Sequence, residues 1–388
     1  MKQINIIGTI FGSSGYDSHT RQLTSALFEK ERVKLTTNLI PNWQRFCKDY
    51  ELEMIKRESE NNETNLIITN PTFWRLNLGP EKNIAYFVWE GDRVPEWFIG
   101  EITNPKIDKV IVPSQHTYDA IVNTLFDYHK NKGEFDEKEE GSTTFSSGLW
   151  HYKGSLMWEK LKVVHHGVDT KLFFPKKRNH DSFRFFANKG LTDIEDRGGI
   201  QYLIQAYLEE FKLSDNTELV VKVNPAYKIT DLNKIVNDLS PKNRKDLPKI
   251  VFITDNIPFE KMPELYQETD VFVSPTRAEA FNLPCLEAMA CGKPVITTNF
   301  GGQVEYVNNK NGWVISGELE EVKHDINYEG CKWLTPYIEE LREVLKDAYS
   351  NQDKVWEKGN NALKTAKKMT WNNTADKILE IIANNNEK

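Results

Sequence analysis

The chain has 388 residues, which is more than one hydrophobic core usually serves, so two domains are expected. Its hydrophobic content of 39% and charged content of 28% are those of an ordinary globular protein. The formal net charge of -7 argues against a general nucleic-acid binder, because binding a phosphate backbone requires a basic surface.

The N-terminal half alternates short apolar runs with helix-like stretches. Residues 4–8 predict a buried strand, and a loop rich in glycine and serine at residues 12–17 leads into a helix over about residues 18–30. Such a turn can present backbone amides to a ligand, or it can be purely structural. It has neither the GxGxxG nor the GK[ST] spacing, which argues against binding of NAD or of a phosphate in a P-loop. Further apolar runs predict a parallel, doubly wound sheet, at residues 33–35, 66–69, 84–88 and 110–112.

Charged residues follow the apolar run at residues 84–88. Glu90 and Asp92 come where a strand delivers side chains to a crevice, so they are candidate ligand-binding residues; alternatively, they cap or pair with Arg93. After a helix through about Phe126, residues 127–152 are highly charged and irregular. We interpret this segment as an insertion whose default role is solvation and whose alternative role is that of an acceptor lid or partner site.

Two adjacent histidines, His165 and His166, precede the lysine-rich residues 175–180. No other histidine or cysteine completes a zinc-ligand set at a suggestive spacing, so we predict a structural turn here rather than a metal site. The lysine-rich segment is the predicted domain linker. The four cysteines also lack metal-binding spacing and are expected to be free thiols in a reducing compartment.

The C-terminal half repeats this architecture with a different sequence. Lys189 and Arg197 lie at a predicted strand end and a predicted helix start, where two cations suit an anionic ligand, although a lone basic loop residue is usually just solvated. Residues 318–330 form an acidic insertion, and the tail from Trp333 onward is predicted to be helical. The strands are expected at residues 183–187, 219–223, 250–254, 271–273 and 312–315.

The most informative stretch is residues 270–295. A short buried strand ends at Ser274 and Pro275, and a helix that begins near Pro284 ends before Pro294. Glu279 precedes this helix and Glu287 lies within it, so both carboxylates can converge on a ligand at the carboxyl end of the strand. Alternatively, Glu279 is a solvated loop residue and Glu287 complements the helix dipole; spacing alone leaves both interpretations open.

The stretch SPTRAEAFNLPCLEAMACGKPVITTNFGGQVEYV resembles the nucleotide-sugar-binding signature of the retaining glycosyltransferases of family 4. The resemblance covers nearly the whole chain and is strongest over residues 161–313. It implies that Glu279 contacts the donor sugar and that Glu287 binds the ribose. Asn282 stands where that family usually has glycine. The other implied donor-side residues are Lys189 and Arg197 for the diphosphate, Phe281 and the amides of Asn282 and Leu283 near it, and Asp255 and Asn256 near the base.

The same resemblance implies an α/β fold with two Rossmann-like domains facing each other across a cleft, the GT-B arrangement. The acceptor domain would span residues 1–177 and be completed by a C-terminal helix at about residues 369–388 that crosses back to it; the donor domain would span residues 178–368. Many family members carry a histidine where Trp89, Glu90 and Asp92 stand here, so no histidine role is carried over. The acceptor-side candidates are Ser14, Gly15, Tyr16, Glu90, Asp92 and His166.

A retaining, metal-independent glycosyltransferase is therefore expected, which moves a sugar from a UDP-, GDP- or ADP-sugar to a hydroxyl of a glycan, lipid-linked or protein acceptor. No cofactor is expected, and no acidic metal motif stands out. The alternatives are a nucleotide-sugar epimerase and a non-catalytic subunit that binds sugar nucleotides; a dehydrogenase would leave Glu279 and Glu287 without a role. Without a signal peptide or membrane span in the sequence, we expect a cytoplasmic protein, either free or at the inner face of a membrane.

Overall fold

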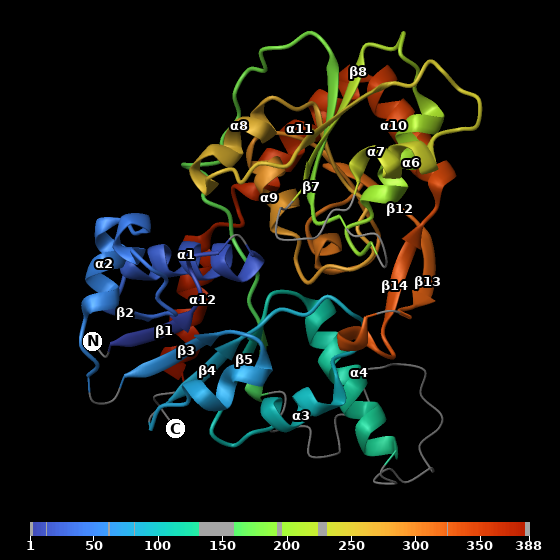
Figure 1. The fold of residues 1–388 in the computed structure, drawn as a ribbon. Coiled ribbons are helices and arrows are strands. Elements are labelled where there is room, and N and C mark those ends of the chain that lie inside the picture. Colours follow the sequence, from blue (N-terminus) through green and yellow to red (C-terminus); the bar gives the residue numbers. More distant parts are fainter. Residues whose placement is uncertain are drawn as a thin grey trace. The chain divides into compact units, whose positions relative to one another are not determined.

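The computed structural model forms two compact units, Met1–His166 with Trp371–Lys388 as unit 1, and Gly167–Thr370 as unit 2 (Figure 1). The predicted domain boundary, at residues 177 and 178, lies a short way into unit 2. None of the helices among the described residues is long and apolar enough to span a membrane. The structure describes residues 3–12, 14–60, 63–80, 82–131, 159–191, 196–223, 231–323 and 325–384. The predicted insertion at residues 127–152 therefore lies largely outside the described residues.

Unit 1 is built on a six-stranded sheet in the order β2-β1-β3-β4-β5-β6, and all neighbouring strands are parallel. The strands are β1 Ile4–Gly8, β2 Val33–Thr36, β3 Thr64–Ile68, β4 Asn83–Tyr86, β5 Lys109–Val112 and β6 Leu161–Val163. The helices are α1 Gly15–Phe28, α2 Asp49–Lys56, α3 Glu96–Ile102, α4 Gln115–Asn131 and α12 Trp371–Asn384. The predicted parallel, doubly wound sheet of the N-terminal half is thus confirmed.

Unit 2 contains a second parallel sheet of six strands, in the order β12-β11-β10-β7-β8-β9. The strand order reverses between β7 and β10, which makes the carboxyl ends of these two strands a topological switch point. The strands are β7 Phe183–Lys189, β8 Thr217–Val223, β9 Lys249–Ile253, β10 Val271–Ser274, β11 Val295–Thr298 and β12 Gly312–Ile315. The helices are α6 Ile200–Glu210, α7 Leu232–Leu239, α8 Met262–Gln267, α9 Leu283–Ala290, α10 Ile338–Ser350 and α11 Gln352–Ala366.

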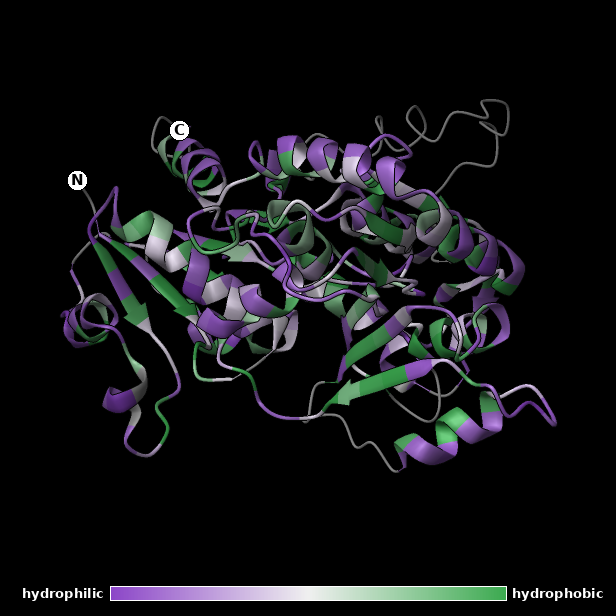
Figure 2. Ribbon diagram, turned by 90° about the horizontal axis from the view of Figure 1, so that it is seen from above, coloured by the Kyte–Doolittle hydropathy of each residue, from purple (hydrophilic) through white to green (hydrophobic). Residues whose placement is uncertain are grey.

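The unit 2 sheet is buried on both faces. Phe185 packs with buried residues of α6 and α10 on one face, whereas the next residue, Phe186, packs with Tyr266 of α8 and with α9 on the other. Figure 2 colours much of the strands as hydrophobic, whereas the helices carry both hydrophobic and hydrophilic residues. Continuous apolar strands are typical of parallel sheets that are covered on both faces. The predicted pair of Rossmann-like domains is therefore confirmed.

The C-terminal helix α12 belongs to unit 1, as the sequence predicts. The indole nitrogen of Trp371 donates a hydrogen bond to Oε1 of Gln22 in α1 at 2.8 Å. The hydroxyl of Thr374 donates to the backbone carbonyl of His165, also at 2.8 Å. These contacts join segments that are far apart in the sequence and return the end of the chain to its first domain.

A two-stranded antiparallel hairpin follows β12, with strands β13 Gly317–Glu321 and β14 Lys332–Pro336. The sequence predicted an acidic insertion here and helices from Trp333 onward. The second prediction is wrong for residues 333–336, and the first helix of the tail begins only at Ile338. The sequence KWLTP suits a strand, because an aromatic and a β-branched residue favour a pleated surface and Pro336 can stand only at the strand's end.

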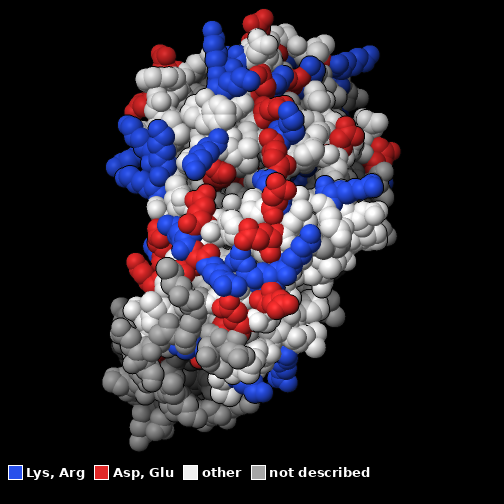
Figure 3. Space-filling view, turned by 90° about the vertical axis from the view of Figure 1, so that its left-hand side faces the viewer, with Lys and Arg blue, Asp and Glu red and all other residues white. Residues whose placement is uncertain are grey.

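Charges of both signs are interspersed on the face of the molecule drawn in Figure 3. Many basic side chains on this face have acidic side chains nearby, although one group of basic side chains lies together at the upper left.

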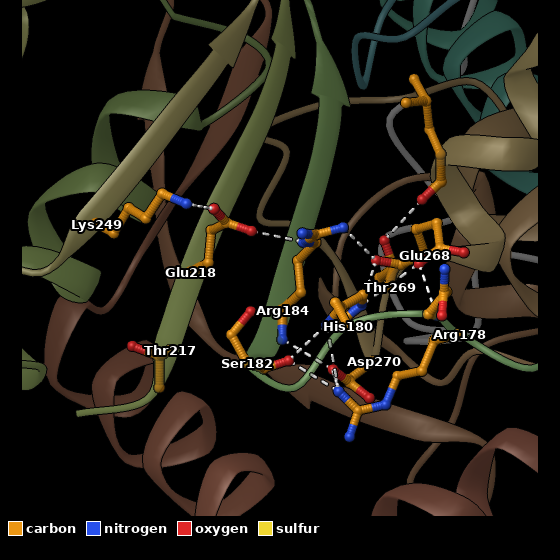
Figure 4. Close-up of polar contacts among 12 residues, drawn as sticks. Arg178, His180, Ser182, Arg184, Thr217, Glu218, Lys249, Glu268, Thr269 and Asp270 are labelled. Carbon is orange, nitrogen blue, oxygen red and sulfur yellow. Dashed lines mark hydrogen bonds and ion pairs between the residues drawn. The ribbon is translucent and has the colours of Figure 1, made fainter.

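A polar network ties together the amino ends of the unit 2 strands (Figure 4). Nε of Arg184 lies 2.7 Å from Oε2 of Glu218, which also pairs with Lys249, and Arg178 donates to Asp270 at 3.1 Å. Burial alone would raise the pKa of Glu218, but hydrogen bonds and charge from Lys249 and Arg184 lower it. This network lies at the sheet edge opposite to the carboxyl ends, which leaves the latter edge for a ligand.

Two histidines are buried inside unit 1, at the point where the chain leaves the unit and returns to it. The ring of His19 lies 4.2 Å from that of His166, 4.4 Å from that of Tyr86 and 5.6 Å from that of Trp371, between ring centroids. Burial lowers the pKa of His19 to about 3. Burial, together with the neighbouring His19 and His165, lowers the pKa of His166 well below its usual range. Both imidazoles are therefore neutral at pH 7.

Acidification is expected to destabilise unit 1 through this pair. Below about pH 6.5 the unfolded chain binds protons at these histidines that the folded unit does not, so the free energy of unfolding falls as the pH falls. Each histidine can contribute a slope of up to about 1.4 kcal/mol per pH unit. Urea unfolding of the wild type and of His19→Phe between pH 7.5 and 5 should give a shallower slope for the variant. Equal slopes would contradict a buried neutral His19.

Candidate functional site

The loops after β7 and β10 bring together four residues that the sequence singled out. Lys189 is the last residue of β7, and its ammonium lies 2.8 Å from Oε1 of Glu279 and 2.8 Å from Oδ1 of Asn282. The guanidinium of Arg197 lies 3.6 Å from the same Glu279 oxygen and donates to the carbonyl of Ala278 at 2.9 Å. Two cations, a carboxylate and an amide thus converge at one sheet edge.

This cluster lies at the switch point of the unit 2 sheet, where the strand order reverses between β7 and β10. Parallel α/β sheets bind ligands outside the carboxyl ends of their strands at such a point. Lys189 ends β7 and Ser274 ends β10, so both loops begin at this edge.

The charges of the cluster compensate one another. Burial alone would raise the pKa of Glu279, but the cations of Lys189 and Arg197 outweigh it and lower the pKa. Glu279 is therefore ionised at neutral pH. A closed, partly dehydrated site with two fixed cations can stabilise negative charge that develops on a bound group.

Asn282 has a left-handed backbone, with φ 70° and ψ 62°, immediately before α9. Asparagine tolerates this conformation better than most residues, which is why it can stand where glycine was expected. Its amide also donates to the Ser274 hydroxyl at 3.0 Å while its oxygen accepts from Lys189. The Tyr306 hydroxyl donates to the carbonyls of Phe281 and Asn282, at 2.7 and 2.8 Å. The side chain of Asn282 and the backbone carbonyls of the loop thus both have hydrogen-bond partners. Leu283 is the first residue of α9.

Glu287 is buried in α9, with an exposed fraction of 6%, and its Oε2 accepts a 2.7 Å hydrogen bond from the hydroxyl of Tyr266. That hydroxyl in turn accepts from Nδ2 of Asn188 at 3.3 Å. Burial raises the pKa of Glu287 to about 7, although the Tyr266 hydrogen bond and the Lys189 charge act in the opposite direction. The carboxyl is therefore only partly ionised at neutral pH, and its capacity to accept hydrogen bonds grows as the pH rises.

Arg277 anchors the Glu279 loop to the β13–β14 hairpin. Its backbone N–H donates to the carbonyl of Arg197 at 2.8 Å, and its carbonyl accepts from the N–H of Leu334 at 2.9 Å. Its buried guanidinium donates to Glu320 and Thr335 of the hairpin, at 3.4 and 3.2 Å. The hairpin thereby fixes the backbone of Arg277, which contacts the backbone of Arg197 and lies two residues before Glu279.

Of the residues predicted to lie on the acceptor side, the structure brings Tyr16 and Glu90 near each other. The hydroxyl of Tyr16 accepts from the N–H of Val88 at 3.2 Å, just after β4. Burial raises the pKa of Tyr16, and the charge of Glu90 contributes in the same direction. Ser14 and Gly15 are exposed at the start of α1. These residues lie at the carboxyl edge of the unit 1 sheet.

The loop before α1 is already occupied by a carboxylate of the chain itself. Oδ1 of Asp17 accepts from the N–H of Gly12 at 2.9 Å, and its Oδ2 accepts from the N–H of Ser14 at 3.1 Å. Because a carboxylate takes both amides, this loop does not offer them to a phosphate. This arrangement agrees with the sequence argument that the loop is not a P-loop.

The other predicted residues lie in three further places. His166 is packed in the interior of unit 1 with His19 and Trp371. The backbone carbonyl of Asp92 accepts from Asn123 of α4 at 3.2 Å. Asp255 and Asn256 are exposed in the loop after the edge strand β9. Among the described residues, no group of three or more His, Cys, Asp or Glu side chains is arranged to hold a metal ion.

Sequence reasoning did not identify Tyr266, Tyr306 or Arg277. Tyr266 lies between Leu265 and Gln267, and Tyr306 between Glu305 and Val307, where an aromatic residue is most simply explained as core. Arg277 was visible only as one more charge in the loop, since the hairpin that holds it was not predicted. Their hydroxyl and guanidinium contacts depend on segments about 20 to 60 residues away.

Known proteins share features with this chain in both sequence and fold. Residues 192–328 match the family model described as Glycosyl transferases group 1. The matched part contains Arg197, Glu279, Asn282 and Glu287, and therefore most of the cluster. It also contains the hairpin strand β13, and it ends before β14.

Two curated relatives illustrate the likeness in sequence. A probable sucrose-phosphate synthase of Thermosipho melanesiensis is 24% identical over 233 residues, which cover 59% of this chain and 48% of the relative. A GDP-mannose-dependent alpha-(1-6)-phosphatidylinositol monomannoside mannosyltransferase of Mycolicibacterium smegmatis is 30% identical over 166 residues, which cover 39% of this chain and 42% of the relative. The chain thus spans about half the length, or less, of these relatives.

The fold extends the likeness to the whole chain. The structure of HepE from Anabaena in complex with UDP-glucose superposes with a TM-score of 0.67, and the match covers 99% of this chain and 100% of that one at 14% identity. At this identity the likeness shows the fold alone, which is that of the GT-B proteins.

Proposed function

We propose that the protein is a glycosyltransferase that takes a hexose from a nucleoside-diphosphate sugar and transfers it to a hydroxyl group of an acceptor. The observation that carries this proposal is the convergence of Lys189, Arg197, Glu279 and Asn282 at the switch point of the unit 2 sheet. The match of residues 192–328 to group 1 glycosyl transferases supports it.

The chemistry assigns a role to each group of the site. In glycosyl transfer the nucleoside diphosphate leaves with growing negative charge, which Lys189 and Arg197 would stabilise together with backbone amides at the start of α9. Donor binding would draw these cations from Glu279 to the diphosphate, and Glu279 would then be available to orient the sugar. Glu287 would exchange its Tyr266 hydrogen bond for the ribose hydroxyls. We propose that the reaction proceeds without a metal ion and with retention of anomeric configuration.

The test is calorimetric binding of UDP, GDP and ADP, without added metal, to the wild type and to Glu287→Ala. Loss of the ribose partner should weaken binding of the preferred nucleotide by about 1.5 to 3 kcal/mol, as for a hydrogen bond to a charged group. Glu264→Ala is a suitable control, because Glu264 is an exposed carboxylate on α8, the helix that also carries Tyr266. If no nucleotide binds, or if Glu287→Ala binds as well as the wild type, the proposal fails.

Transfer is then distinguished from its alternatives by turnover. A transferase consumes the nucleotide sugar fastest with an acceptor present, whereas an epimerase would turn over without one. A non-catalytic subunit would bind the nucleotide and release no product. The HepE structure with UDP-glucose makes UDP-glucose the first donor to assay, and the mannosyltransferase relative makes GDP-mannose the second.

A further inference from the structure

Lys222 is a charged residue among the apolar residues of the second half of strand β8. It is the second-last residue of β8, and its exposed fraction is only 8%. In the sheet it stands directly between Asn188 of β7 and Ile253 of β9. Residues paired in register on parallel strands project from the same face, so these three side chains form one row at the carboxyl edge of the sheet.

This row is connected to Glu287 through the hydroxyl of Tyr266. The side chain of Asn188 donates to the Tyr266 hydroxyl at 3.3 Å, and this hydroxyl donates to Glu287 at 2.7 Å. On the other side of Lys222, Ile253 is half-buried, as are Ile257 and Phe259 of the following loop, and all three pack against the same core. Lys222 thus lies between a polar group that suits a ribose and an apolar wall that suits a flat ring.

The ammonium of Lys222 has no hydrogen-bond or ion-pair partner in the part of the chain that the structure describes. Lys189 and Lys249 of the same sheet both pair with carboxylates, by contrast. Burial lowers the pKa of Lys222. A lysine side chain that is largely buried, and to which the described residues offer no acceptor, suits a ligand that brings an acceptor group.

We propose that Lys222 donates a hydrogen bond to the base of the bound nucleoside diphosphate and selects a base with a carbonyl oxygen, uracil or guanine, over adenine. This inference rests on the proposed function. The strands follow one another in the order β10-β7-β8-β9. Lys189 and Arg197, which would bind the diphosphate, follow β7, and Glu279 follows β10. A nucleotide whose ribose reaches Glu287 would therefore extend its base toward β8 and β9.

The selection follows from donor and acceptor chemistry. An ammonium group has three donors and no acceptor. Guanine presents a carbonyl oxygen where adenine presents an amino group, and uracil presents a carbonyl oxygen at its corresponding edge. A site whose buried donor faces another donor loses both its own hydrogen bond and that of the base, so the adenine nucleotide should bind more weakly.

The experiment is calorimetric titration of UDP, GDP and ADP into the wild type and into Lys222→Met, with folding of the variant checked by its thermal unfolding. The wild type should bind UDP or GDP more tightly than ADP by roughly 10- to 100-fold, and Lys222→Met should lose most of that preference by weakening the preferred nucleotide alone. Lys222→Gln, whose amide both donates and accepts, should likewise lose the preference and serves if the methionine variant does not fold.

Lys249→Met is the matched control, since Lys249 lies on the neighbouring strand but pairs with Glu218 at the opposite edge (Figure 4). Its preference among the nucleotides should stay that of the wild type. An unchanged preference in Lys222→Met, or an equal loss for all three nucleotides, would overturn the assignment to the base. If the wild type binds a nucleotide and only Glu287→Ala weakens it, the inference fails while the proposed function stands. If the wild type binds none, both fail.

Discussion

Lys189→Met is expected to lower the turnover number for the nucleotide sugar by about 10²- to 10³-fold, the usual cost of one donor that stabilises a developing negative charge. Lys189 is buried and contacts both Glu279 and Asn282, so it is fixed before any ligand binds. Its loss would leave Arg197, at 3.6 Å from Glu279, as the cation of the cluster that faces this carboxylate. The pKa of Glu279 should also rise, because the charge of Lys189 is the largest of the interactions that lower it.

The measurement is a steady-state assay with the donor whose nucleotide binds in calorimetry. A fall in the turnover number with a smaller change in KM would indicate that Lys189 acts mainly on the transition state. Lys189→Arg keeps a cation at the strand end and should lose less activity than Lys189→Met, whereas Lys249→Met at the opposite edge should stay near the wild type. Turnover of Lys189→Met within about threefold of the wild type would be too small for this role.

The sequence predicts the site's sheet edge well, because alternating strands and helices place every strand end on one side of a parallel sheet. Lys189 and Glu279 are 90 residues apart, yet both follow strands whose apolar runs are evident in the sequence. The short motif around Glu279 and Glu287 then predicts which side chains lie at this edge. Spacing alone left open whether the two glutamates are solvated or belong to a ligand site. The burial of Glu287 and the contacts of Glu279 with two cations argue against simple solvation.

The contacts that shape the site were harder to predict, since they come from segments with ordinary local patterns. Tyr266 belongs to an apolar helix face, and its hydroxyl matters only because Glu287 packs on the same core. The hairpin that holds Arg277 was predicted in part as helix. Lys222 did leave a signal, because it is a charged residue inside the otherwise apolar run LVVKV.

His166 shows the same limit in the N-terminal half. Its neighbours in sequence indicate a turn that leads to the linker, and the resemblance implied a position on the acceptor side. The rings around it come from His19, Tyr86 and Trp371, and the last of these lies some 200 residues further on. A return of the chain's end to its first domain covers the histidine in a way that the local sequence does not reveal.

Gly199→Ala is expected to destabilise unit 2 by about 3 kcal/mol or more, because it combines a strained backbone with a direct clash. Gly199 precedes α6 with φ 73°, which an L side chain rarely adopts. A Cβ at this position would lie 1.9 Å from the carbonyl oxygen of Pro275, in the loop that carries Glu279. Relief of the clash must move this loop or Arg197, so nucleotide binding should weaken together with stability.

Gly330→Ala separates the two causes. Gly330 has nearly the same backbone, with φ 76°, but a Cβ there would meet no heavy atom within 4 Å. Its substitution should therefore cost about 1 kcal/mol, the conformational part alone, and leave nucleotide affinity unchanged. Urea unfolding and UDP or GDP titration of both variants measure the difference. If Gly199→Ala proves no more destabilising than Gly330→Ala, the loops after β7 and β10 can separate without loss, and their close contact does not hold Arg197 and Glu279 together.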